Sequence, residues 1–471
     1  MRTVAAGPAG IREVRELREA LGDRTAWIVG GTVRDELLGR PLRDIDVAVV
    51  GDPEPAARAI AKVVRGPVFR LSEAFGAWRV VDRDRVFDVS PLQGETIEED
   101  LARRDFTINA MAEPLSGGEL IDPQGGHADL QNGTLRVLCA GAYSADPLRP
   151  LRLARLAAEL GFGPDPETER LTRDAAGRVG EASPERQFAE LRRLVLAGGV
   201  LAGLELADRL GLLGPVLPEV AELHGVEQSH YHHLDVYDHT MEVLSRQIDL
   251  EGRLEELFDP RLRDVLDEPL GDELSRMEAL RFGALLHDIG KPATRSVRPD
   301  GRATFIGHDA VGEKMVHRLG RRLRTSQVFA RFVGGLTRHH LVLGFLVHEA
   351  PLDREAVYRY LDLTEPVEVE VTLLSCADRL ATRGKKAEAA IERHLALARE
   401  LMAEALDWRA SGGPRPPLRG DELARELGIE EGPELGRLLA ELRRAAFTGE
   451  ATTPQAAVEL AHGLLRKRQG E

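Results

Sequence analysis

The pattern of apolar and polar positions changes near residue 140 of this 471-residue chain. Before that point, short runs rich in valine and isoleucine alternate with longer mixed stretches, as in a small α/β unit. The runs Ala26–Val29, Ile45–Val50 and Val86–Ser90 predict strands. Residues 53–65 and 100–112 predict helices.

Beyond residue 145 the strand signals almost disappear. Apolar side chains recur at helical spacing in Leu148–Leu160, Pro184–Leu196, Leu201–Leu210 and many later segments. A glycine- and proline-rich stretch, Ser411–Pro417, predicts a linker before a short helical tail. We therefore expect an α+β protein with a small mixed α/β head and an elongated, mostly α-helical body. The expected domains are residues 1–140, 141–222, 223–400 and 401–471.

Composition narrows the class of protein. Hydrophobic residues make up 43% and charged residues 30%, which is ordinary for a globular protein. No stretch is long and apolar enough for a membrane span, and the N-terminus lacks the pattern of a secretory signal. The only cysteines are Cys139 and Cys376, which excludes a disulfide framework. We expect a cytoplasmic protein. Its net charge of -15 argues against coating nucleic acid through bulk charge but allows a local basic groove.

Two glycines follow the first predicted strand directly. Gly30 and Gly31 allow the backbone to approach a ligand closely, and the next helix begins with free N–H groups. Such a turn suits a triphosphate. A tight strand–helix turn without a ligand is the alternative.

Acidic residues alternate with apolar ones on the next strand. Asp44 and Asp46 are two residues apart, so they lie on one face of the strand, while Ile45 faces the core. Paired carboxylates of this kind suit Mg²⁺ beside a nucleoside triphosphate. Asp88, on the strand Val86–Ser90, is a candidate third ligand. A solvated strand edge that carries acidic residues is the alternative.

These segments resemble the signature of class II tRNA nucleotidyltransferases and bacterial poly(A) polymerases. The sequence GGTVRDELLGRPLRDIDVAVVGD (30–52) carries the resemblance first. It continues in family order with EEDLARRDFTINAMA (98–112), IDPQGGHADL (121–130), DPLRPLRLARLAAELGF (146–162) and ASPERQFAEL (182–191). Five ordered motifs are far more specific than any one of them.

The resemblance implies roles for individual residues in the transfer of CTP or ATP to the 3′ end of tRNA. Asp44 and Asp46 would hold the catalytic Mg²⁺, with Asp88 as the third carboxylate. The residues implied in binding phosphates, triphosphate and ribose are Gly30, Gly31, Arg34, Arg103, Arg104, Asp105 and Asn109. Asp146 and Arg149 would read the incoming base. An alternative for that pair is a helix N-cap with an i, i+3 partner.

Arginines recur along the predicted helix 148–160. Arg149, Arg152 and Arg155 are spaced at i, i+3 and i+6, so they lie near one helix face. We expect them to form a local groove for nucleotide and tRNA. Binding through such a groove predicts a strong loss of tRNA affinity with salt despite the acidic composition.

The chain departs from the family pattern in one segment. A long flexible loop usually separates the strand of the third carboxylate from the RRDF segment, but here only residues 89–102 lie between them. In the family, a shortened loop is associated with enzymes that add only the two cytidines. The resemblance therefore leaves open whether A is added.

Histidines gather in the second half of the chain, where 11 of 14 lie between His224 and His348. His239, His287, Asp288 and Asp378 resemble the H…HD…D metal set of the HD phosphohydrolase superfamily. This implies a divalent ion (Mn²⁺, Ni²⁺, Fe²⁺ or Mg²⁺) and hydrolysis of a phosphoester. By analogy the substrate is a 2′,3′-cyclic phosphate or 2′-phosphate at an RNA end.

Further histidines match positions that can hold a second metal ion there, namely His308 and either His339 or His340. Buried histidines that only satisfy hydrogen bonds, or a degenerate HD fold kept as scaffold, are the alternatives. For His230, His232 and His233, histidines that only satisfy hydrogen bonds are the favoured interpretation.

Four functions remain in view. The favoured one is addition of C and C, with or without A, to tRNA, with residues 141–222 reading the base and 401–471 contacting tRNA. A CC-adding enzyme or a poly(A) polymerase of the same family is the second. The third gives the HD hydrolase the main activity, with the head as an RNA adaptor. The fourth is a non-enzymatic RNA-binding protein. The sequence leaves the oligomeric state open.

Overall fold

The computed structural model describes residues 12–72, 76–83, 85–228, 235–382 and 387–469. The chain divides into two compact units, Met1–Val216 and Leu217–Glu471. We describe each unit by itself. The finer division into four domains stays a prediction.

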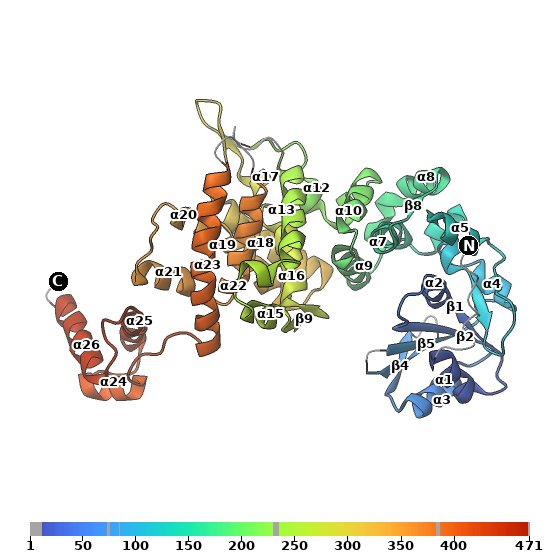
Figure 1. The fold of residues 1–471 in the computed structure, drawn as a ribbon, viewed down its shortest axis with the longest axis horizontal. Coiled ribbons are helices and arrows are strands. Elements are labelled where there is room, and N and C mark those ends of the chain that lie inside the picture. The colour runs from blue at the N-terminus through green and yellow to red at the C-terminus, as the bar shows by residue number, and fades with distance from the viewer. Residues whose placement is uncertain (1–11, 73–75, 84, 229–234, 383–386, 470–471) are drawn as a thin grey trace. The chain divides into compact units, whose positions relative to one another are not determined.

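A mixed six-stranded sheet forms the centre of the head (Figure 1). Its order is β3-β4-β5-β2-β1-β6, and its strands are β1 (Ala26–Val29), β2 (Asp44–Val49), β3 (Val68–Ser72), β4 (Ala77–Asp82), β5 (Arg85–Pro91) and β6 (Ala112–Pro114). β2 and β5 are parallel, and the other neighbours are antiparallel. The three strands predicted from the sequence are confirmed.

The alternation along β2 determines which side chains reach the core. Ile45, Val47 and Val49 are at most 3% exposed, because they face the packed side of the sheet. Helices α1 (Arg12–Leu21) and α3 (Glu54–Val64) contact each other beside the sheet, and α2 (Gly31–Leu37) contacts β2. The helix predicted at 53–65 is therefore confirmed as α3.

The single helix predicted over residues 100–112 is wrong. This segment contains the end of α4 (Ile97–Leu101), a 3-10 turn at Thr107–Asn109 and the start of β6. Phe106 is extended and bridges Val137 by backbone pairing, and Ala112 bridges Ile121. Both pairings are with distant segments, so tertiary contacts override the local helical pattern.

Helices complete the N-terminal unit after the sheet. The predicted helices 148–160, 184–196 and 201–210 are confirmed as α7 (Arg149–Leu160), α9 (Pro184–Leu196) and α10 (Val200–Arg209), which pack on one another. The other elements are α5 (Gly126–Asn132), β7 (Thr134–Leu135), α6 (Ala140–Ala145), β8 (Gly163–Pro164), α8 (Pro166–Ala175), a 3-10 helix (Ala176–Glu181) and α11 (Leu213–Val216).

The second unit is almost wholly helical. Its main helices are α13 (Val236–Glu251), α16 (Arg276–Leu286), α18 (His308–Leu323), α19 (Gln327–His339), α21 (Arg354–Thr364), α22 (Glu368–Leu380) and α23 (Ala387–Ser411). Shorter elements are α12 (Pro218–Ala221), α14 (Leu254–Leu257), α15 (Arg261–Leu266), α17 (Lys291–Thr294), α20 (Val342–Leu346) and the strands β9 (Pro269–Gly271), β10 (Leu274–Ser275), β11 (Ser296–Val297) and β12 (Ala303–Thr304). Among the described residues, no helix combines the length and hydropathy that crossing a membrane requires.

A three-helix tail ends the second unit. Its helices are α24 (Gly420–Leu427), α25 (Pro433–Thr448) and α26 (Pro454–Gln469). Leu423, Leu442 and Ala457 are fully buried in a small core of their own. The predicted linker Ser411–Pro417 coincides with the end of α23 and the segment before α24.

Candidate functional site

Three carboxylates come together on β2 and β5. Asp46 is the register partner of Asp88 across the parallel pair, and Asp44 lies two residues before Asp46 on the same strand. Burial, together with the negative charges of Asp88 and Asp44, raises the pKa of Asp46 to about 6, although Arg104 opposes the shift. A site that concentrates negative charge in this way favours a bound cation.

The three carboxylates are not equally available. Both oxygens of Asp88 accept hydrogen bonds from Arg79, at 2.7 Å each. Asp44 is exposed and has no side-chain partner among the described residues. Asp44 and Asp46 are therefore better placed than Asp88 to bind an ion.

The turn of Gly30 and Gly31 lies against these carboxylates. Gly30 has a φ of 67°, and a Cβ atom there would lie 2.5 Å from Arg104 Nη1 and 3.5 Å from Asp46 Oδ2. Only glycine leaves room for Arg104 beside Asp46. Thr32, which sequence reasoning missed, accepts a hydrogen bond from the Asp46 N–H at 2.7 Å and donates to the Asp44 carbonyl at 3.2 Å. It thereby fixes the turn to the strand.

A chain of hydrogen bonds connects the turn helix to α7. Arg34 donates to Asn109 Oδ1 at 2.7 Å, Asn109 donates to Asp105 Oδ1 at 3.0 Å, and Arg152 donates to Asp105 Oδ2 at 2.8 Å. Burial opposes ionisation of Asp105, but Arg152 outweighs it and lowers the Asp105 pKa. These four predicted nucleotide-binding residues form one connected, ionised network.

The predicted base-reading residues do not pair with each other. Asp146 accepts from Arg186 at 2.6 Å and from the Leu148 N–H at 3.1 Å, but the N-cap of α7 is Leu148, and no side chain caps that helix. Arg149 donates instead to three backbone carbonyls, those of Arg103, Arg104 and Ala142. Its Nε is buried and has no hydrogen-bond partner in the described structure. The alternative of a helix N-cap with an i, i+3 side-chain partner is therefore wrong.

The predicted arginine groove is largely engaged within the protein. Arg155 is 5% exposed and binds Glu190 and Glu159 at 2.5 and 2.6 Å, while Arg152 binds Glu190 at 3.0 Å. These two side chains therefore join α7 to α9, and their role in RNA binding stays a prediction. Arg103 is exposed, and no hydrogen bond or ion pair of its guanidinium occurs among the described residues.

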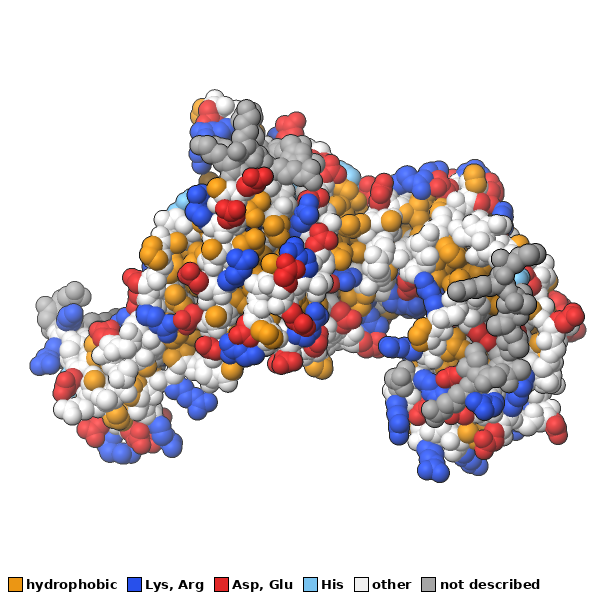
Figure 2. Space-filling view, viewed as in Figure 1, with side chains coloured by type: hydrophobic (Ala, Val, Ile, Leu, Met, Phe, Trp, Pro, Cys, Tyr) orange, Lys and Arg blue, Asp and Glu red, His pale blue; other side chains and the backbone are white. Residues whose placement is uncertain are grey.

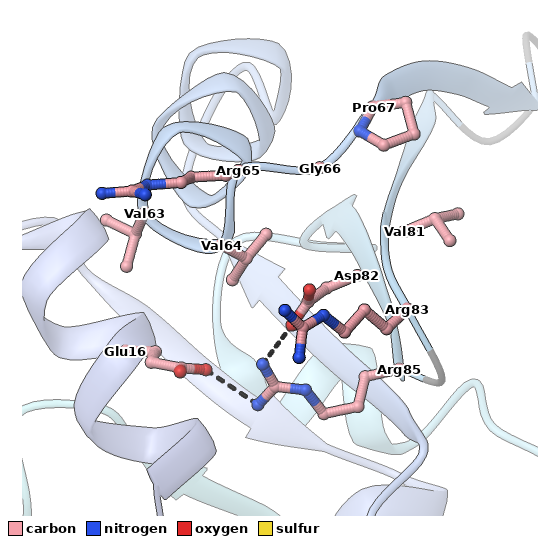
Figure 3. Close-up of a pocket in the computed structure, with 10 residues that line it drawn as sticks. All are labelled: Glu16, Val63, Val64, Arg65, Gly66, Pro67, Val81, Asp82, Arg83 and Arg85. Carbon is pink, nitrogen blue, oxygen red and sulfur yellow. Dashed lines mark hydrogen bonds and ion pairs between the residues drawn. The ribbon is translucent and has the colours of Figure 1, made fainter.

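A cavity of about 450 Å³ in the head contains none of the predicted transfer residues (Figure 3). Figure 3 shows Arg85 between Glu16 of α1 and Asp82 of β4, with an ion pair to each. The Nη1–Oε2 distance to Glu16 is 2.8 Å. Arg85 therefore holds α1 on the hairpin of β4 and β5, which is a structural role.

In the second unit, the predicted HD residues converge from five helices and helix ends. Asp288 lies at the centre, 3.2 Å from His287 Nε2, 3.3 Å from His308 Nε2 and 3.7 Å from His340 Nε2. His239 Nε2 is 3.1 Å from Asp378 and 3.8 Å from Asp288. Two overlapping groups have metal-ligand spacing, namely His239, His287 and Asp288, and Asp288, His308 and His340.

The histidine rings are oriented by the backbone. The Nδ1 atoms of His287, His308 and His340 lie 2.7–2.8 Å from the carbonyl oxygens of Ala284, Phe305 and Thr337. A carbonyl partner makes Nδ1 the protonated nitrogen, so the Nε2 lone pair points into the cluster. Burial lowers the pKa of His340 to about 3, which keeps that ring neutral. This is the donor arrangement that a divalent ion needs.

Two buried polar atoms of the cluster that lack a hydrogen bond test this interpretation. His287 Nε2 and Asp288 Oδ1 are buried, and neither has a hydrogen bond among the described residues. Such atoms cost free energy unless an ion or ligand compensates them. The residues present therefore fit a divalent ion.

The structure distinguishes between two adjacent histidines. His340 joins the cluster, whereas His339 belongs to neither group of described side chains with metal-ligand spacing. His230, His232 and His233 lie outside the described residues. Lys291, which the sequence pattern did not single out, lies 2.5 Å from Asp288 Oδ2. Its position three residues after Asp288, on the same face of a turn, was the available signal.

Three family models match successive parts of the chain. Residues 26–96 and 92–136 match the family model of the poly A polymerase head domain, and residues 161–223 match the probable RNA and SrmB-binding site of polymerase A. Residues 236–383 match the HD domain. The chain is thus a nucleotidyltransferase that carries an HD phosphohydrolase domain.

Curated relatives identify the family. The chain is 36% identical over 438 residues to the A-adding tRNA nucleotidyltransferase of Deinococcus radiodurans, covering 92% of this chain and 94% of the relative. It is 36% identical over 446 residues to the CC-adding tRNA nucleotidyltransferase of Thermus thermophilus, covering 92% of each. A solved CCA-adding enzyme with CTP has the same fold, with a TM-score of 0.64, 20% identity and coverage of 98% of this chain and 96% of that one. The chain belongs to the class II tRNA nucleotidyltransferase family and acts on the 3′ end of tRNA.

Proposed function

We propose that the chain adds two cytidines to the 3′ end of tRNA and stops before the terminal A. The observation that carries this proposal is the short connection between β5, which holds Asp88, and α4. Only Leu92–Thr96 lie between the two elements. The resemblance associates a shortened loop at this point with CC addition, whereas the relatives at 36% identity include both a CC-adding and an A-adding enzyme.

The connection is also held in place. The Gln93 N–H donates to Asp100 Oδ1 at 3.0 Å, the Glu95 N–H donates to Glu99 Oε2 at 2.9 Å, and Thr96 caps α4. A segment bonded in this way cannot extend over the site.

The proposed chemistry is displacement at the α-phosphorus of CTP. The ribose 3′-oxygen of tRNA forms a bond to that phosphorus and loses its proton, the bond to the bridging oxygen breaks, and pyrophosphate leaves. Asp44 and Asp46 would hold Mg²⁺, which supplies positive charge for the triphosphate and the attacking oxygen. Arg104 has room beside Asp46 because residue 30 is a glycine. It would stabilise negative charge on the phosphates.

Base recognition is assigned to Asp146 and Arg149. Arg149 is fixed by three carbonyl oxygens and keeps one unpartnered N–H, which is a rigid donor. Asp146 would accept a hydrogen bond from the base once Arg186 moves aside. Leaving such buried groups unsatisfied costs about 1–3 kcal/mol, which is enough to reject a wrong base by about five- to 150-fold.

Product length on tRNA that ends before CCA tests the proposal. We expect two added residues with CTP, and no further residue when ATP is also present. A third residue would show CCA addition, and a ladder with ATP alone would show a poly(A) polymerase; either result overturns the proposal. Asp44→Ala should abolish incorporation. If the HD hydrolase were instead the main activity and the head only an RNA adaptor, the main activity would survive this substitution.

A second proposed activity is phosphoester hydrolysis at the HD centre, by which we mean the cluster of His239, His287, Asp288, His308, His340 and Asp378. The two groups of buried side chains with metal-ligand spacing favour it over a degenerate scaffold. His239, His287, Asp288 and Asp378 would hold one divalent ion, and His308 and His340 would assist a second. By analogy the substrate is a 2′,3′-cyclic phosphate or 2′-phosphate at an RNA end. Release of inorganic phosphate or ring opening by the Mn²⁺-loaded protein, lost in Asp288→Asn, tests this activity.

A further inference from the structure

A cavity of about 320 Å³ lies beside the HD centre in the second unit. His340 and Asp378, two members of the HD centre, are part of its lining, so a ligand in the cavity would also touch that centre. The other lining residues come from α20, α22 and α23 and from residues that flank α20 and α22. Its size suits one small ligand rather than a length of polymer.

Two arginines give the cavity a positive wall. Arg379 follows Asp378 on α22, and Arg393 faces the cavity from α23. Neither guanidinium has a hydrogen bond or ion pair among the described residues, and Arg379 Nε is buried without a partner. In an acidic chain, two arginines that lack carboxylate partners at one cavity point to an anionic ligand such as a phosphate.

An exposed aromatic ring lies in the same cavity lining. Phe345 of α20 is 67% exposed, although it is a large apolar side chain. Exposed aromatic rings beside arginines are a common platform for nucleobases, because every base has a flat face that can stack. An inorganic anion has no flat face and would not stack on this ring.

We propose that the cavity is a nucleoside-binding subsite of the HD centre. It takes one ribonucleoside phosphate, whose phosphate lies between the HD centre and the two arginines and whose base stacks on Phe345. The proposal rests on the proposed hydrolysis, which it deepens by naming the residues that select the substrate. In that hydrolysis a water oxygen bonds to phosphorus, the bond from phosphorus to a ribose oxygen breaks, and that oxygen takes the proton.

Kinetics of the Mn²⁺-loaded full chain provide the first test. The readout is selectivity, the ratio of kcat/KM for 2′,3′-cyclic adenosine monophosphate to that for β-glycerophosphate, which has no base. We expect Phe345→Ala to lower this ratio about tenfold, mainly through the KM for the nucleotide, and Phe345→Tyr to restore it. Leu363→Ala, an exposed apolar residue outside the cavity, is the matched control. An unchanged ratio in Phe345→Ala overturns the subsite and leaves the hydrolysis standing.

Binding without turnover provides the second test. Equilibrium dialysis with adenosine 2′-monophosphate is run in excess CTP, which occupies the head. We expect weaker binding in Phe345→Ala and Arg379→Ala and unchanged binding in Arg318→Ala, an exposed arginine outside the cavity. If the protein hydrolyses nothing but binding follows this pattern, the proposed hydrolysis fails and the subsite stands. Equal dissociation constants in all variants overturn the subsite.

The same variants identify the source of the nucleotide. An RNA oligonucleotide ending in a 2′,3′-cyclic phosphate is compared with the free cyclic nucleotide. Lower kcat/KM on both in Phe345→Ala assigns the terminal residue of RNA to the cavity. A loss confined to the free nucleotide assigns the free compound, and both results support the subsite.

Discussion

Single carboxyl groups in the head are held in very different environments. Asp105 is ionised because Arg152 outweighs its burial, whereas burial raises the pKa of Glu36 to about 7. Glu113 and Glu13 add to that shift, and one Glu36 oxygen is buried with no hydrogen-bond partner in the described structure. The difference follows from whether an arginine lies within reach.

Glu36→Gln should therefore stabilise the head in a pH-dependent way. The folded state holds the Glu36 proton more tightly than the unfolded chain, whose pKa is near 4.5. Stability from the protonated carboxyl is complete below pH 4.5, falls as the pH rises, and is lost above about pH 7. The gain in melting temperature should be small at acidic pH and level off above neutrality. A gain that is equal at every pH would contradict this account.

Residue-level prediction from sequence worked where one rule decides the outcome. The alternation of β2 alone puts Asp44 and Asp46 opposite Ile45 and Val47. It failed where partners come from distant segments. Nothing around Arg155 in the sequence shows that Glu190 lies against it, so an apparent surface stripe is a buried ion pair. The choice between His339 and His340 likewise depends on where α19 ends.

At the scale of elements, the turn between β1 and α2 combines strain with crowding. Gly30→Ala and Gly39→Ala both place a side chain at a positive φ, 67° and 68°, so each should cost about 1 kcal/mol of stability. Only at Gly30 would the new Cβ meet another group, Arg104. Displacing one charged contact, worth about 1.5–3 kcal/mol, should slow CTP incorporation about ten- to hundredfold. Equal rates in the two variants would contradict a role for Arg104.

The contact between α7 and α9 depends on one buried acid. Glu190 binds both Arg152 and Arg155, so Glu190→Ala leaves one buried and one partly buried guanidinium undercompensated. We expect a loss of about 3–5 kcal/mol, measured by hydrogen exchange of α7 and α9 in the full chain. Glu181→Ala, which breaks an exposed pair with Arg178, should cost less than about 1 kcal/mol. Similar losses in both variants would show that the pairs of Glu190 stabilise the protein no more than the exposed pair does.

Elements were predictable where local periodicity and tertiary packing agree. The helices α7, α9 and α10 follow their apolar spacing, since the same face that predicts the helix also packs in the unit. Over residues 100–112 the two disagree. The apolar side chains of Phe106, Ile108 and Met111 are fully buried, but the chain reaches that burial through backbone bridges and a short turn rather than a helix.

At the scale of the whole molecule, each compact unit contains one candidate site. Residues 1–216 hold the carboxylates of β2 and β5, and residues 217–471 hold the HD centre. Substitutions in one unit should therefore leave the other activity unchanged. Asp44→Ala should abolish nucleotide incorporation and preserve phosphoester hydrolysis, and Asp288→Asn should do the reverse. Loss of both activities in either variant would show that the sites are coupled.

The chain has a net charge of -15, yet it acts on tRNA, which is also negatively charged. Figure 2 shows acidic and basic side chains interspersed on the face drawn, and many arginines, such as Arg443 and Arg444, bind carboxylates. Arg103 is available to meet a phosphate, because no hydrogen bond or ion pair of its guanidinium occurs among the described residues. tRNA affinity should still fall steeply with salt, because each phosphate contact releases counterions.

Arg103→Ala should reduce the slope of log affinity against log salt by about 0.7–0.9, the value of one phosphate contact. Arg103→Lys, which keeps the charge, should retain the slope, and Arg178→Ala, whose guanidinium is engaged by Glu181, should not change it. Fluorescence anisotropy of labelled tRNA over a range of KCl concentrations measures all four proteins. The alanine variant isolates one cation while the fold and the remaining charges stay constant, so its slope reports contact with RNA directly. A flat salt dependence in the wild-type protein would mean that shape and neutral hydrogen bonds hold the tRNA, and that the arginines serve the protein's own architecture.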